Sequence, residues 1–184
     1  MFILVLSITS CIGVETEISI NPDSSGQILM EYRIRGELES LGTLDGNQRW
    51  LTIPVGRADF ERSLSRLPGI KLVSFTSKSE GSDQLHRVKL DFTDLDALMS
   101  FLNDAGRHAD IRRNGSSRLT LTLSDGAPLD ENLRVMLKSV MENYRFKLTV
   151  KSFLSSKAGK TTEYSSSMGE ILVSETPVIV EIDL

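Results

Sequence analysis

The sequence predicts an α+β domain in which an antiparallel, curved sheet of about six to eight strands has about three helices packed on one face. Two observations lead to this prediction. Stretches of alternating apolar and polar residues come in pairs joined by turn residues, and a stretch with apolar residues at helical spacing follows these pairs. This order of hairpin and helix occurs three times in succession, as ββα-type units that share a pattern but not their residues.

The first hairpin is predicted from the alternation between Val14 and Ile20 and between Ile28 and Ile34. The turn residues of 21–26 separate the two strands. Residues 36–56 are apolar but irregular. We favour a partly regular segment here, with a strand over 49–53 that completes the core. The alternative is a functional loop that covers a pocket or touches a membrane through Trp50.

The second unit begins after a short helix in which Phe60, Leu64 and Leu67 recur at helical spacing before Pro68-Gly69. A hairpin is predicted over 70–76 and 85–92. The next helix starts after Thr93, with Asp94 and Asp96 in its first turn, and ends at Gly106.

The third unit has predicted strands over 109–113 and 118–123 around an Asn-Gly turn, then a helix from the N-cap Asp130 to Met141. In the tail, strands are predicted over 146–151, 171–173 and 178–182. The serine-rich residues of 155–160 and 165–167 are interpreted as solvated loop.

Composition limits the function classes. The chain has 184 residues, a net charge of −4 and a single cysteine. The acidic balance argues against a nucleic-acid partner, because such domains need a strongly basic surface. One cysteine allows neither an internal disulfide nor a zinc-finger spacing. No cofactor and no metal site are expected.

The N-terminus carries the clearest signal. An apolar run from Phe2 leads into Ile8-Thr9-Ser10-Cys11, which resembles the lipobox of bacterial lipoproteins. The resemblance implies that residues 1–10 are a signal peptide and that 11–184 form a single envelope domain, with diacylglycerol on the Cys11 sulfur. Because no Lys or Arg precedes Cys11, we expect the true start codon to lie upstream. The alternative is a buried strand over 2–6 that ends at a core cysteine.

A second resemblance covers most of 11–184. The lipobox cysteine, the turn Asp23-Ser24-Ser25-Gly26 and the closing strand over 178–182 are similar to the LppM-type domain of bacterial lipoproteins. That family often has a tryptophan in the last strand, where this chain has aliphatic residues. The resemblance implies a protein exported and lipid-anchored to the cell membrane or outer membrane, facing the periplasm or the cell surface. Lipid or hydrophobic-ligand binding is suggested for the family, without catalytic residues.

Catalytic motifs are absent from the sequence. It contains no phosphate-binding loop, no Gly-x-Ser-x-Gly and no His-Glu-x-x-His. His86 has the same strand parity as Val88 and is interpreted as a packed histidine, and His108 has no partner that its spacing selects. We therefore expect a protein that is not an enzyme.

Two features are candidate contacts with a ligand or a membrane. Basic residues gather between 107 and 118 and could meet anionic headgroups or an acidic partner, although a solvated strand face is the favoured interpretation. They are Arg107, His108, Arg112, Arg113 and Arg118. The other candidate is the interior, where apolar stripes could enclose a cavity for an acyl chain or a filled core.

The function that these observations favour is a non-catalytic, membrane-anchored envelope lipoprotein that binds a lipid or another hydrophobic ligand. The alternative is an interaction subunit of a cell-envelope complex that uses the outer sheet face or residues 36–56. An apolar cavity would favour the first function, and a solid core with an exposed apolar patch would favour the second.

Overall fold

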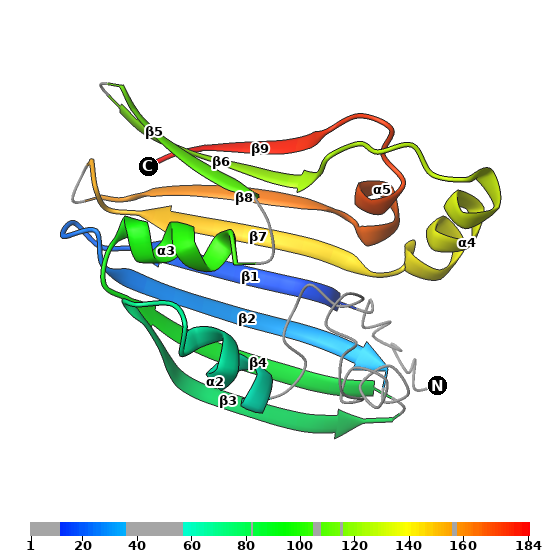
Figure 1. Cartoon of the computed structure of the whole chain (residues 1–184), viewed down its shortest axis with the longest axis horizontal. Helices are drawn as coiled ribbons and strands as arrows, with labels where there is room; N and C mark the ends of the chain where they lie inside the picture. The colour runs from blue at the N-terminus through cyan, green and yellow to red at the C-terminus, as the bar shows by residue number, and fades with distance from the viewer. Residues whose placement is uncertain (1–11, 36–56, 82, 105–107, 115, 156–157) are drawn as a thin grey trace, which may run out of the picture.

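The computed structural model describes residues 12–35, 57–81, 83–104, 108–114, 116–155 and 158–184, and their strands and helices form two layers (Figure 1). The strands are β1 (Ile12–Ile20), β2 (Gly26–Arg35), β3 (Ile70–Glu80), β4 (Asp83–Phe92), β5 (Ala109–Asn114), β6 (Ser116–Ser124), β7 (Arg145–Ser152), β8 (Lys160–Ser167) and β9 (Val178–Asp183). The helices are α2 (Arg57–Leu64), α3 (Leu95–Leu102), α4 (Glu131–Met141) and α5 (Met168–Leu172).

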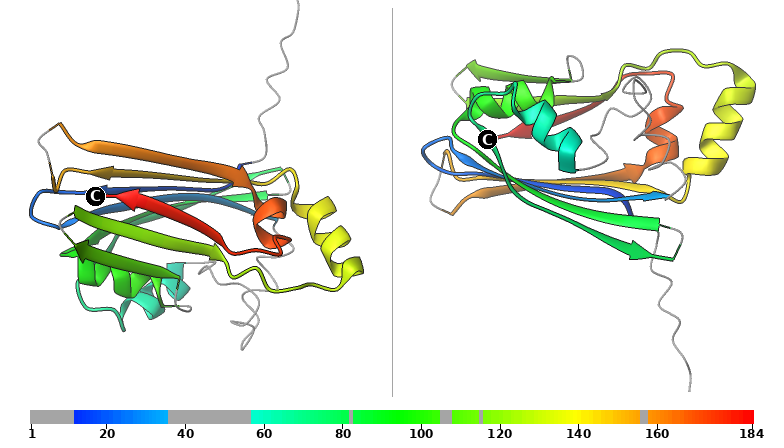
Figure 2. Two further views of the ribbon diagram at one scale, coloured as in Figure 1. Left: turned by 90° about the horizontal axis from the view of Figure 1, so that it is seen from above. Right: turned by 60° about the horizontal axis from the view of Figure 1, so that its bottom comes forward.

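These strands are divided between two sheets. The larger has six strands in the order β3-β4-β2-β1-β7-β8, and the smaller has three in the order β5-β6-β9. Figure 2 shows the smaller sheet, α2 and α3 over one face of the curved larger sheet, with α4 and α5 at one end of the two layers. The predicted α+β class is confirmed. The smaller sheet and the helices together cover one face of the larger sheet.

The alternation in the hairpin strands separates a core face of the larger sheet from a solvated one. Ile18 of β1, Ile28 of β2 and Leu148 of β7 are buried toward the smaller sheet. The intervening residues form cross-strand ion pairs on the other face, and these pairs are Glu15–Lys147, Glu17–Lys151 and Glu31–Arg87. One apolar face and one charged face are expected of a sheet that is covered by a second layer on one side only.

One pair of strands in the larger sheet is parallel. β1 pairs with β2 in the antiparallel direction and with β7 in the parallel direction, so that Thr16 lies opposite Leu148. Parallel neighbours need a long crossover, and here the whole chain from β2 to α4 separates the two strands. The prediction of an antiparallel sheet is therefore wrong for one pair, β1 with β7, and every other neighbouring pair in the described larger sheet is antiparallel.

Two predictions for the tail are wrong. Residues 165–167, predicted as solvated loop, belong to strand β8 together with Lys160, because all eight residues of β8 pair with β7. The loop prediction is confirmed for the described residues 155, 158 and 159, which lie outside the strands and helices. Residues 168–172 form helix α5 and not a closing strand over 171–173. The cause is a capping box, in which the Ser167 hydroxyl accepts the Glu170 N–H and the Glu170 carboxylate accepts the Ser167 N–H.

The tail thereby adds β7, β8 and α5 as another hairpin followed by a helix, and β9 then joins the smaller sheet. The predicted strands over 14–20, 28–34, 70–76, 85–92, 109–113, 118–123, 146–151 and 178–182 are confirmed. The predicted strand over 49–53 lies outside the described residues.

Candidate functional site

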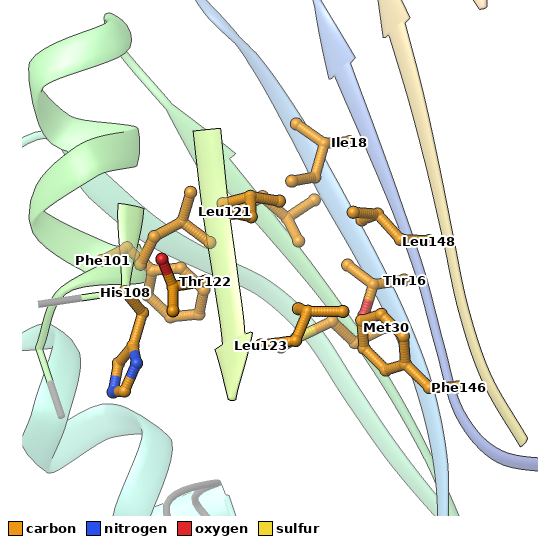
Figure 3. Close-up of a pocket in the computed structure, with 12 residues that line it drawn as sticks. Thr16, Ile18, Met30, Phe101, His108, Leu121, Thr122, Leu123, Phe146 and Leu148 are labelled. Carbon is orange, nitrogen blue, oxygen red and sulfur yellow. The ribbon is translucent and has the colours of Figure 1, made fainter. Parts of the chain in front are cut away.

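A pocket of about 170 Å³ lies between the two sheets, next to the C-terminal end of α3. β1, β2 and β7 supply one wall and β6 supplies the other (Figure 3). The lining residues are Thr16, Ile18, Ile28, Met30, Phe101, Leu102, His108, Leu121, Thr122, Leu123, Phe146 and Leu148. Nine of these twelve residues are aliphatic, aromatic or methionine, so the pocket offers an apolar environment.

Burial changes along the pocket. Ile18, Ile28, Leu121 and Leu148 are buried, with exposed fractions of 6% or less. At the other end Met30, Leu123 and Phe146 converge and are only half-buried (Figure 3). The pocket therefore has a deep end between the sheets and a shallower end bounded by these three side chains.

Helix α3 is fixed in place by its caps. The Asp94 carboxylate accepts the Ala97 N–H at 2.8 Å, and the Asp94 pKa is lowered by this bond and by the Thr93 hydroxyl. At the other end, Asn103 Oδ1 accepts the N–H groups of His108 and Ala109 at 2.7 and 2.8 Å. Asn103 thus ties the helix that carries Phe101 and Leu102 to the first strand of the smaller sheet.

His108 is the one titratable residue among the described residues that line the pocket. It is exposed, and its imidazole points away from the apolar side chains around Met30 (Figure 3). Apart from His108, the polar side chains among the described lining residues are those of Thr16 and Thr122. The described lining can therefore hold an apolar group.

His86, by contrast, is 1% exposed and stacks with Tyr32 and Phe75 at ring-centroid distances of 5.0 and 5.5 Å. The interpretation of His86 as a packed histidine is confirmed. It lies away from the pocket lining and takes no part in the site.

Of the predicted basic cluster, His108 lines the pocket, whereas Arg112, Arg113 and Arg118 are not among its lining residues. Arg112 is exposed, 3.5 Å from Asp110, and Arg118 binds both Asp183 and Glu181 across β9. The structure places Arg113 in β5. The β5–β6 hairpin that carries these residues ends far from the beginning of β1 along the long axis of the molecule (Figure 1). Cys11, Trp50 and Arg107 lie outside the described residues.

An ion pair joins the two sheets. Lys160 Nζ of β8 donates to the Asp183 carboxylate of β9 at 2.9 Å, and Arg118 Nε donates to the same carboxylate at 2.9 Å. The Lys160 bond, followed by the Arg118 bond, lowers the pKa of Asp183 below its usual 3.8. This contact links the edge of the larger sheet to the smaller sheet.

We expect the Asp183 contact to make stability depend on acid pH. Because the folded pKa is lower than the unfolded one, its contribution is present above about pH 4 and is lost as the pH falls through the folded value. Asp183→Asn should lower the unfolding temperature at neutral pH and flatten its decline below about pH 4. Asp110→Asn, which removes an exposed carboxylate from within the smaller sheet, is the control. Circular dichroism melts that decline equally for Asp183→Asn and the unmodified chain would contradict this prediction.

No protein-family model matches the chain, and no curated protein matches it. Among solved structures, it is similar to the folded domain of LppM from Mycobacterium tuberculosis. The TM-score is 0.44 and the sequence identity 16%, over 93% of this chain and 87% of that one. The lipobox stays a prediction. A similarity of this size says nothing about ligands.

The described residues also bear on metal binding and on crossing a membrane. They hold no group of three or more His, Cys, Asp or Glu side chains placed to bind a metal ion. None of the helices in the described ranges is long and apolar enough to cross a membrane.

Proposed function

We propose that this protein is a non-catalytic bacterial envelope lipoprotein, held at a membrane through lipidated Cys11, whose domain binds an apolar ligand in the pocket between its sheets. The observation that supports ligand binding is the pocket itself. It has apolar walls, a buried deep end and a volume of about 170 Å³ between the two sheets.

The volume indicates what kind of group fits. An engineered cavity of about 150 Å³ lined by apolar side chains stays dry and binds benzene. A pocket of about 170 Å³ therefore has room for one ring or for a short part of an acyl chain, and the rest of a lipid would extend past the shallow end at Met30, Leu123 and Phe146. Ligand binding would be driven by apolar burial, because nine of the twelve described lining residues are aliphatic, aromatic or methionine.

Blocking the shallow end should abolish binding. Leu123 is half-buried beside Met30 and Phe146 (Figure 3), so the indole of Leu123→Trp should occupy the space that a ligand chain needs. We expect the affinity for a fluorescent fatty acid to fall at least about tenfold, which corresponds to about 1.4 kcal/mol. Leu29→Trp is the matched control, since Leu29 is 43% exposed and follows the lining residue Ile28 on the opposite face of β2.

Mass spectrometry tests both halves of the proposal on the full chain from a bacterial host. Under native conditions a co-purified ligand should add mass that disappears on denaturation, and the diacylglyceryl group on Cys11 should remain after denaturation. A chain that carries no ligand, binds no added fatty acid, or binds it equally well in Leu123→Trp and Leu29→Trp would contradict ligand binding in the pocket.

A further inference from the structure

Helix α4 presents apolar side chains to solvent. Leu133, Val135 and Met136 are 40%, 59% and 53% exposed. The helix packs against α5 at the end of the two layers and not over the core face of the larger sheet (Figure 2). Exposed apolar side chains that gather on one element mark a surface that meets another apolar phase.

These side chains belong to one continuous face. Residues three or four apart are neighbours on a helix, and the steps from Leu133 to Met136, from Met136 to Asn132 and from Asn132 to Val135 are all of this kind. None of the four is charged. The charged residues of α4 are Glu131, Arg134 and Lys138. Arg134 is half-buried and bonded to Glu131 and Glu175, and the exposed Glu131 and Lys138 border the face beside Val135. We call Asn132, Leu133, Val135 and Met136 the α4 face.

The start of β1 lies at the end of the molecule where α4 lies. Ile12, the first residue of β1, is in register with Arg145, which follows α4 by only a short connection. A Cβ on Gly13 would come within 2.9 Å of the Tyr144 Cβ, so β1 and that connection are in direct contact. Figure 1 shows the beginning of β1 and the helices α4 and α5 at the same end of the long axis.

We propose that the α4 face lies against the bilayer in which the lipid of Cys11 is embedded. This inference rests on the proposed anchor. Cys11 directly precedes Ile12, and one extended residue spans at most about 3.6 Å. A lipidated Cys11 would therefore hold this end of the domain at the membrane surface, where the apolar side chains of α4 can enter the boundary between headgroups and acyl chains.

The contact is apolar and not electrostatic. The α4 face has no charge, and the exposed Lys138 of the same helix is offset by the exposed Glu142 that follows it. Binding should therefore be the same on neutral and anionic bilayers and should be insensitive to salt. The arginines of the β5–β6 hairpin, at the other end of the molecule, take no part in it.

The test places an environment-sensitive fluorophore on the full, lipidated chain in vesicles of phosphatidylcholine, with and without phosphatidylglycerol. Lipidation leaves Cys11 unreactive, so Met136→Cys can be labelled alone. Val73→Cys is the matched control, because Val73 is 45% exposed and lies near the start of β3, which the strand pairing places at the turn end of the β1–β2 hairpin and away from the start of β1. The label at position 136 should shift its emission to shorter wavelength and resist an aqueous quencher in both kinds of vesicle, whereas the label at position 73 should do neither.

Several results would overturn the inference. A lipidated chain whose two labels are quenched equally would show an anchored domain that does not use α4. Protection at position 136 in detergent without vesicles would indicate a second copy or a protein partner, and protection on anionic vesicles alone would indicate a charge contact. Whether Cys11 is lipidated is measured separately, by the mass of the denatured chain. If the diacylglyceryl mass is absent, the anchor fails and this inference fails too.

Discussion

Replacing Leu98 with alanine is expected to lower the free energy of unfolding by about 3 kcal/mol. Leu98 is 0% exposed in α3, the helix that contacts β3 and β4 of the larger sheet and β5 of the smaller one. Its removal leaves a void where both layers meet, and close-packed neighbours collapse only partly into such a void. Urea unfolding followed by circular dichroism measures the change.

Leu133→Ala is the control for this substitution. Leu133 is also a leucine in a helix, but it is 40% exposed, so truncation should change the free energy of unfolding by less than about 0.5 kcal/mol. A loss below about 1 kcal/mol for Leu98→Ala, or equal losses for the two variants, would mean that α3 does not hold the layers together.

Replacing Gly26 with alanine is expected to cost about 3 kcal/mol, through overpacking and not through a void. A Cβ at this position would lie 2.0 Å from the Ser19 carbonyl oxygen and 2.4 Å from the Phe92 ring. The first of these atoms belongs to the backbone of the paired strand β1, so the end of the β1–β2 hairpin must open to make room. Thermal unfolding should show a large decrease in the midpoint temperature.

Gly81→Ala separates this lack of space from backbone strain. A Cβ on Gly81 would meet nothing within 4 Å, but the residue has φ of +67°. Alanine there should cost about 1 kcal/mol, from the left-handed conformation alone. If Gly26→Ala lowers the free energy of unfolding no more than Gly81→Ala does, then the close approach of Ser19 and Phe92 does not exclude a side chain at position 26.

Much of the fold could be predicted from local patterns. The hairpins of β1–β2 and β3–β4 follow from alternation, and α4 follows from Asp130 and apolar spacing. Composition misled at β8, where Ser and Thr occupy a strand that β7 stabilises through backbone pairing. At α5, three apolar residues suggested a strand although Ser167 and Glu170 already marked a helix start.

Long-range pairing could not be predicted in the same way. Periodicity tells which face of a strand is buried but not which strand lies beside it. The parallel pair of β1 with β7 and the separation of β5, β6 and β9 into a second sheet depend on contacts between residues far apart in the chain. These contacts decide where the two layers meet and hence where the pocket lies.

The pocket shows most clearly what sequence patterns do not predict. Ile18, Ile28, Leu121 and Leu148 follow the same alternation as the residues of a filled core, so the sequence left both interpretations open. Whether facing side chains fill the gap depends on the distance between the sheets. Asn103 had no signal in the sequence analysis beyond its place near the predicted end of a helix, yet it ties α3 to β5 beside the pocket.

The most direct test of ligand binding locates the ligand. A fatty acid with a nitroxide near the end of its chain should bind the full chain, and methyl signals of residues within its reach should broaden in NMR spectra. We predict broadening at Ile18, Ile28, Leu121 and Leu148, and its loss in Leu123→Trp but not in Leu29→Trp. Bound fatty acid that leaves these four signals sharp and broadens Leu133 and Met136 of α4 instead would contradict a binding site between the sheets.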